Sequence, residues 1–174
     1  MSDLYSSQVS FDLTTKVSDR VWFEKQDERA TLPTRATGAS AAFDLYAIED
    51  TTIIGGMGNV LVKTGVGIGL PEGRYGRLAV RSGGAKDDHL TITAGVIDRD
   101  YHRAIGCYIS CTKVIEMVDG KPELRPHVAV IKAGERFAQI VIEMCDDRAP
   151  EEDPKRMCPR PEHKHEGFGS TGKK

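Results

Sequence analysis

The sequence predicts an all-β domain, a sandwich or barrel built from short strands. Short runs of β-branched or alternating apolar residues recur along most of the chain, and no stretch shows a helical period. The chain has 18 glycines and only 6% aromatic residues, a composition closer to a turn-rich β protein than to a helical bundle. At 174 residues, it is long enough for one domain with a core and short for two.

The strands are expected in the following order. Val9, Phe11 and Leu13 alternate with polar residues, as in a half-buried strand. Further runs, separated by turn formers such as Gly-Gly and Pro-Glu-Gly, cover residues 21–23, 43–54, 59–62, 66–70, 75–80, 105–111, 114–118, 128–132 and 137–143. Asp119-Gly120 is typical of a two-residue hairpin turn.

The composition changes after Met144. Residues 146–166 contain four prolines, many charges and almost no large apolar side chain, so this segment cannot bury enough surface to order itself alone. We therefore expect residues 1–145 to form the β domain, with an N-terminal extension within 1–40, and residues 146–174 to form a flexible arm. Fully extended, the 21 residues of 146–166 reach about 70 Å, enough to act on a neighbouring subunit.

Composition also limits the function classes. The net charge of −2 gives no global attraction to nucleic acid or anionic membranes. No apolar run approaches the roughly 20 residues of a membrane span, and the first ten residues lack a secretory signal, so we expect an intracellular, cytoplasmic protein, or a nuclear one in a eukaryotic cell. The four cysteines are predicted to be free thiols, because they are too sparse for a disulfide scaffold: Cys107, Cys111, Cys145 and Cys158.

Three segments carry residue types suited to chemistry on a phosphate ester. Residues 76–84 end a predicted strand in a Gly-rich turn, where backbone amides, Arg81 and Ser82 can converge on an anion; the alternative is a tight turn with a surface arginine. Residues 94–101 place Asp98, Asp100 and Tyr101 at a predicted hairpin, where a carboxylate can take a proton from water; the alternative is a charged turn with a packed tyrosine.

The third segment is the tail, residues 166–172. Phe168 can cover a flat ring, while Ser170, Thr171 and exposed amides bind phosphate oxygens, an arrangement suited to a lid. The alternative is a disordered terminus. Neither a P-loop nor a dinucleotide-binding glycine motif occurs. No structural metal site is predicted, because the cysteines and histidines lack ligand spacing.

Taken together, these segments resemble the five ordered motifs of the trimeric dUTP pyrophosphatase (dUTPase) family. The matching stretches are residues 42–47, 76–83, 94–101, 134–139 and 167–172. The resemblance implies a jelly-roll-like β-sandwich or barrel and a homotrimer with three active sites at subunit interfaces, each completed by a neighbour's C-terminal arm. It also implies hydrolysis of dUTP to dUMP and pyrophosphate.

The same resemblance implies roles for individual residues. Asp98 would deprotonate the water that attacks the α-phosphorus in line. Tyr101 would pack under the deoxyribose, and backbone groups of the hairpin with Gly95, Val96 and Ile97 would pair with the uracil edge. Mg²⁺ would bridge the phosphates, with one of its waters held by Asp44. The phosphate chain and the lid would be bound by Arg81, Ser82, Gly83 and Gln139, and by Phe168, Gly169, Ser170 and Thr171.

The sequence also departs from the family pattern. His163 stands where the family has the arginine that opens the fifth motif, so the cation for the γ-phosphate is left open among Lys164, Arg160 and Arg156. Residues 112–132 are longer than in compact members, which predicts a protruding hairpin, interpreted as a tolerated surface insertion.

Two other functions are weighed against hydrolysis. A non-catalytic nucleotide-binding module would use the inserted hairpin or the N-terminal extension to hold another protein. A dCTP deaminase would present a catalytic glutamate, and none lies near Asp98.

Overall fold

The computed structural model describes residues 20–146 and 148–149. Thirteen strands and one short helix make up this part of the chain. The strands are β1 (Trp22–Lys25), β2 (Ala42–Tyr46), β3 (Thr51–Ile54), β4 (Val60–Lys63), β5 (Val66–Gly69), β6 (Arg74–Val80), β7 (Leu90–Thr93), β8 (Val96–Ile97), β9 (Gly106–Cys111), β10 (Lys113–Val118), β11 (Lys121–Pro126), β12 (Val128–Ile131) and β13 (Arg136–Met144), and the helix is α1 (Ser82–Asp87). The predicted all-β class is confirmed.

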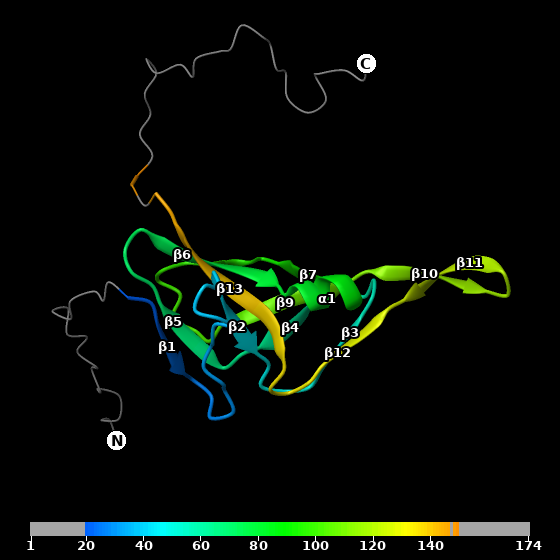
Figure 1. Cartoon of the computed structure of the whole chain (residues 1–174), viewed down its shortest axis with the longest axis horizontal. Coiled ribbons are helices and arrows are strands. Elements are labelled where there is room, and N and C mark those ends of the chain that lie inside the picture. Colours follow the sequence, from blue (N-terminus) through cyan, green and yellow to red (C-terminus); the bar gives the residue numbers. More distant parts are fainter. Residues whose placement is uncertain (1–19, 147, 150–174) are drawn as a thin grey trace, which may run out of the picture.

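Two antiparallel sheets enclose the core (Figure 1). One has the strand order β2-β13-β6-β8 and the other β4-β9-β7, while β1 with β5, β3 with β12 and β10 with β11 form two-stranded ribbons. Leu45, Leu78 and Ile140 of the first sheet share one apolar cluster with Val62 and Ile109 of the second. Alternate side chains of a strand point to opposite faces, which explains why the alternating runs of the sequence become half-buried strands. No helix in the described ranges is long and apolar enough to span a membrane.

The structure corrects three local predictions. The run 43–54 is not one strand, because β2 and β3 are separate and belong to different sheets. Residues 82–84, expected as part of a Gly-rich turn, instead begin the helix α1 (Ser82–Asp87). Residues 94–101 are not a hairpin: β7 pairs with β9, whereas β8 pairs with β6, so the segment crosses from one sheet to the other.

The inserted hairpin is present. Strands β10 and β11 pair along their full lengths, and they project from the body of the molecule (Figure 1). Asp119 and Gly120 at the tip have φ angles of 51° and 75°, the positive values that a two-residue primed turn requires. The hairpin contains no buried residue.

The cysteines and the chain ends were also the subject of predictions. Cys107, Cys111 and Cys145 are free thiols, whereas Cys158 lies outside the described residues. The predicted strand at 9–13 and nearly all of the predicted arm, 146–174, also lie outside them, so the proposed domain boundaries stay predictions.

Candidate functional site

Three charged side chains meet at one end of the four-stranded sheet. The carboxylate of Asp44, on β2, accepts a hydrogen bond from Arg81 Nε at 3.0 Å through Oδ1. Its Oδ2 accepts another from Arg136 Nη1 at 3.3 Å. The Asp44 side chain is 8% exposed, against 34% for Arg81 and 46% for Arg136. The buried anion therefore holds two guanidinium groups that remain partly open to solvent, and these three residues form the cationic cluster.

Strand register explains why these residues meet. Gln139 on β13 lies opposite Asp44 on one side and opposite Ala79 on the other. Its side-chain amide donates to the carbonyl oxygen of Val80 at 3.1 Å, which fixes the end of β6 just before Arg81. Arg81 also donates through Nη1 to the carbonyl oxygen of Arg136 at 3.0 Å. The predicted phosphate-binding residues Arg81 and Gln139 are thus adjacent.

The predicted residues Ser82 and Gly83 begin helix α1 directly after Arg81. The amides of a first helical turn have no partner within the helix, and the cap residue Arg81 makes no side-chain capping bond. Both residues are exposed, and a Cβ at Gly83 would meet no atom within 4 Å. The predicted anion-binding amides therefore come from a helix start instead of a loop, next to the cationic cluster.

The second half of the predicted site is the loop after β8. Tyr101 donates through its amide to Asp98 O at 3.1 Å and through its hydroxyl to Ala104 O at 3.2 Å, so the loop closes on itself as a tight turn. The Asp98 side chain is exposed, whereas Ile97 is 5% exposed and anchors the loop in the core. The Gly95 carbonyl accepts from Leu78 N, so that carbonyl is already used within the sheet.

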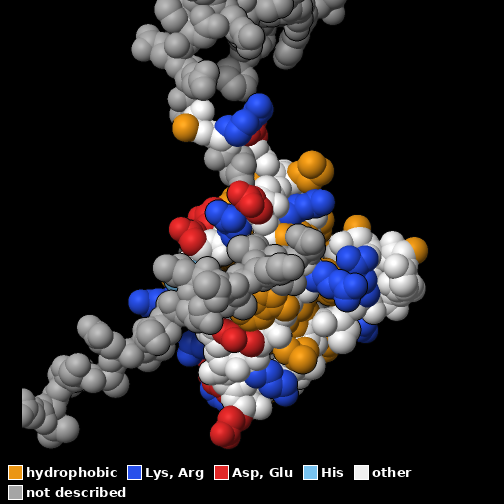
Figure 2. All heavy atoms as spheres, turned by 90° about the vertical axis from the view of Figure 1, so that its left-hand side faces the viewer, with side chains coloured by type: hydrophobic (Ala, Val, Ile, Leu, Met, Phe, Trp, Pro, Cys, Tyr) orange, Lys and Arg blue, Asp and Glu red, His pale blue; other side chains and the backbone are white. Residues whose placement is uncertain are grey.

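Tyr101 lies between two cavities. One, of about 520 Å³, is lined by residues that include Tyr101, Ala104 and Gly106. The other, of about 690 Å³, is lined by Tyr101 and His102 together with Trp22 of β1. The face on the left of Figure 1, where β1 and β5 lie, shows hydrophobic side chains gathered between charged ones (Figure 2). Tyr101 therefore borders open space from which a ligand can reach it.

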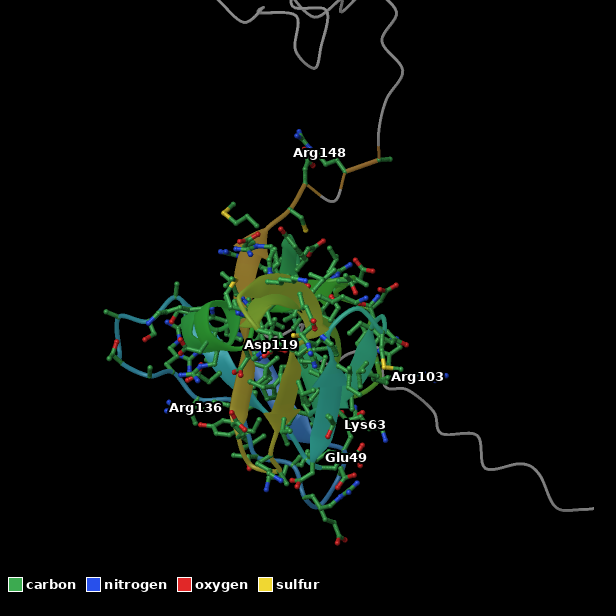
Figure 3. All side chains as sticks on the ribbon, turned by 90° about the vertical axis from the view of Figure 1, so that its right-hand side faces the viewer. Glu49, Lys63, Arg103, Asp119, Arg136 and Arg148 are labelled. Atoms are coloured by element: carbon green, nitrogen blue, oxygen red, sulfur yellow. The ribbon has the colours of Figure 1, made fainter. Side chains whose placement is uncertain are left out.

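The two halves of the predicted site do not meet within one copy of the chain. Strands β6 and β8 are antiparallel and Gly76 pairs with Ile97, so Asp98 lies beside the start of β6, whereas Arg81 follows its end. The six residue-to-residue steps from Tyr75 to Arg81 span about 20 Å in an extended strand. Arg103, in the chain after Tyr101, and Arg136, in the cationic cluster, lie on opposite sides of the molecule in Figure 3.

The start of β6 carries its own charged network. Glu143 on β13 accepts hydrogen bonds from the hydroxyl of Tyr75 and from Arg77 Nε at 2.8 Å. The Arg77 guanidinium and the Tyr75 hydroxyl hold the pKa of Glu143 below its usual range, and the carboxylate in turn raises the pKa values of Tyr75 and Arg77. This network fixes the strand next to which Asp98 is placed.

The sequence reasoning overlooked Arg136 as a site residue. It lies in the stretch 134–139, but only Gln139 was selected from that stretch. Its position between Gly134 and Gln139 in the fourth motif is the signal that could have identified it. Other predicted site residues lie outside the described residues: His163, Phe168, Gly169, Ser170 and Thr171.

Comparisons with known proteins identify the family of the chain. The dUTPase family model matches residues 28–120. The deoxyuridine 5'-triphosphate nucleotidohydrolase of Rattus norvegicus is 37% identical over 151 residues, which cover 87% of this chain and 66% of the rat protein. The chain thus spans just under two thirds of that relative's length.

Solved structures give the same result. The Staphylococcus bacteriophage 80alpha dUTPase with dUPNHPP superposes with a TM-score of 0.72 at 25% identity, covering 89% of this chain and 99% of the phage protein. A mutant dUTPase from phage phi11 of S. aureus, described with a structural Mg(II) ion, has a TM-score of 0.65 at 25% identity and covers 78% of this chain and 97% of its own. The chain belongs to the dUTPase family.

Proposed function

We propose that this protein hydrolyses dUTP to dUMP and pyrophosphate. The observation that carries the proposal is that Asp98 and Tyr101 are exposed in one tight turn beside open cavities. This turn lies within residues 28–120, the part of the chain that matches the dUTPase family model. Such a turn offers a carboxylate and an aromatic ring to the same ligand.

In the proposed reaction, the carboxylate of Asp98 takes a proton from a water molecule. The water oxygen forms a bond to the α-phosphorus, and the bond from that phosphorus to the bridging oxygen of the β-phosphate breaks, so that pyrophosphate leaves with the bonding electrons. Tyr101 packs against the deoxyribose and leaves no space for a 2′-hydroxyl. Backbone N–H and C=O groups of Gly95, Val96 and Ile97 that form no hydrogen bond within the sheet pair with the uracil edge.

The triphosphate binds at the cationic cluster. Arg81 and Arg136, oriented by Asp44, offset negative charge that moves onto the leaving pyrophosphate, together with the amides of Ser82 and Gly83. Gln139 keeps the end of β6 in place. The tail residues Phe168, Gly169, Ser170 and Thr171 close over the bound nucleotide as a lid.

The active form is proposed to be a homotrimer with shared sites. About 20 Å of β6 separates Asp98 from Arg81 within one copy of the chain, too far for Asp98 to act at the α-phosphate while Arg81 contacts the pyrophosphate of the same nucleotide. A complete site therefore takes Asp98 and Tyr101 from one copy and the cationic cluster from another. In a closed trimer with cyclic symmetry, each copy contributes its Asp98 loop to one active site and its cationic cluster to the next.

The described residues fit a magnesium ion held through water and substrate. They contain no group of three His, Cys, Asp or Glu side chains that could hold a metal. Both oxygens of Asp44 accept guanidinium hydrogen bonds, but a carboxylate has about four acceptor sites, so a metal-bound water can still donate to it. Magnesium keeps several waters and binds phosphates readily, and when bound with dUTP it neutralises phosphate charge.

The test is pyrophosphate release from dUTP in the presence of magnesium, compared with the Asp98→Asn variant. The wild-type chain should release pyrophosphate, and the variant should be at least about 100-fold slower, as is usual for loss of a general base. Ammonia release from dCTP would instead identify a deaminase. Tight dUTP binding without turnover would identify a non-catalytic module.

A further inference from the structure

The loop with Asp98 and Tyr101 receives little support from its surroundings. Within the described residues, hydrogen bonds of residues 98–104 are internal to the loop, with one exception. The exception is the side-chain amide of Gln26, whose Nε2 donates to the carbonyl oxygen of His102 at 3.2 Å.

Gln26 is itself held at the end of β1. Its backbone amide donates to Gly65 O at 2.8 Å. Its second Nε2 hydrogen is directed to Glu24 Oε1 at 2.8 Å, so both hydrogens of the side-chain amide have acceptors. Gln26 also lines both cavities that flank Tyr101.

Gly67 on β5 leaves the space that this side chain needs. A Cβ at Gly67 would lie 2.5 Å from Gln26 Nε2 and 3.1 Å from Gln26 Cδ. A Cβ at this position would force the end of the Gln26 side chain to shift, so the glycine leaves the amide in the place from which it reaches His102. The contact therefore depends on two positions, 26 and 67, that lie far from Asp98 in the sequence.

We propose that Gln26 is a positioning residue for the substrate loop, residues 98–104, acting through its hydrogen bond to His102 O. Holding His102 fixes the residue after Tyr101 and thus the ring and the Asp98 carboxylate at the other end of the turn. The role in turnover rests on the proposed hydrolysis of dUTP, whereas the role in holding the loop does not. Reaction rates respond to small displacements of such groups.

The proposal is tested with three variants of the 174-residue chain and one control. Gln26→Ala removes the amide, Gln26→Glu keeps the shape but removes the donor, and Gly67→Ala displaces the amide while leaving Gln26 in the chain. Lys25→Ala is the control, because this exposed neighbour on β1 does not line either cavity.

The first measurement is hydrogen–deuterium exchange of residues 98–104 without nucleotide. Loss of one hydrogen bond predicts exchange about fivefold faster in all three variants, with the control like wild type. Trp22, the single tryptophan, lines the same cavity as Tyr101 and His102, so its fluorescence should change in the same three variants. Unchanged exchange in all three would overturn the proposal, and wild-type exchange in Gln26→Glu alone would overturn the donor role.

The second measurement is steady-state hydrolysis of dUTP. The kcat value should fall about fivefold in the three variants while KM changes by less than about twofold, because the loop is misplaced and not removed. A fall in melting temperature with unchanged kcat would assign Gln26 a purely structural role and overturn the proposal. An inactive wild-type protein would refute the proposed hydrolysis, and the exchange result would still decide whether Gln26 holds the loop.

Discussion

The guanidinium of Arg81 and the carboxylate of Asp44 form an ion pair across the end of the four-stranded sheet, with Nε and Oδ1 3.0 Å apart. Because Asp44 also binds Arg136, one buried anion orients both cations. The pair links a residue near the start of the domain to the helix start at Ser82.

Replacing Asp44 tests this link. In Asp44→Asn, the two guanidinium groups lose their shared counter-ion, so we expect KM for dUTP to rise about tenfold and the free energy of unfolding to fall by about 1–3 kcal/mol. Steady-state kinetics and urea denaturation measure the two effects. Asp50→Asn is the matched control, since its exposed pair with Lys132 lies outside the cluster. Normal KM in Asp44→Asn would show that the ion pair does not orient the cations.

Mixing two inactive variants tests the shared site. Asp98→Asn and Arg81→Ala should each be inactive as homo-oligomers. When they are unfolded together and refolded at equal amounts, sites that combine an intact Asp98 with a neighbour's intact Arg81 form at random, which restores about a quarter of wild-type turnover. Mixing without refolding serves as the control. Absence of any recovery would mean that both residues act from the same subunit.

Acid stability tests the network at the start of β6. The pKa of Glu143 is lowered from its usual 4.5 by Arg77 and Tyr75. A lowered folded-state pKa means that the carboxylate contributes stability above pH 4.5, and that this contribution is lost as the pH falls through the folded-state value. The melting temperature of Glu143→Gln should therefore be lower than that of wild type at pH 7, and the difference should shrink as the pH is lowered from 4.5 to 3, as followed by circular dichroism. A constant difference across that range would contradict the assignment.

Removing the inserted hairpin tests its contribution to the domain. Replacing residues 113–126 with a short Gly-containing turn removes no buried side chain, so we expect the melting temperature to change by only a few degrees and dUTP turnover to stay within about twofold of wild type. Differential scanning fluorimetry and the pyrophosphate assay provide the readouts. A collapse of turnover with an intact fold would give the hairpin a role in the site.

The sequence predicted most of the strands, because alternation such as that around Leu78 reflects which face a side chain buries, but no predicted run covered β7. It missed α1, since Ser82, Gly83 and Gly84 carry no apolar period and the helix buries no residue. The expected hairpin at 94–101 failed for a different reason. The partner of β8 is β6, some twenty residues earlier, and pairing between distant strands is decided by the tertiary fold and not by local turn residues.

In the candidate site, too, local patterns could be predicted and long-range contacts could not. Asp98, Tyr101, Arg81 and Gln139 could be selected because local motifs surround them. The contact between Asp44 and Arg136 joins residues 92 positions apart, and it follows from the register of β13 against β2. The contact between Gln26 and His102 spans 76 positions and likewise leaves no local pattern.

The length of β6 has a consequence for how activity depends on protein concentration. In the proposed trimer, one copy carries the proposed base Asp98 at one end of this strand and the proposed phosphate-binding cations at the other, so a lone copy would hold two half-sites that do not act on one substrate. Dilution below the dissociation constant of the assembly should therefore abolish activity without unfolding the chain. A single damaged copy in an assembly would impair its neighbours as well as itself.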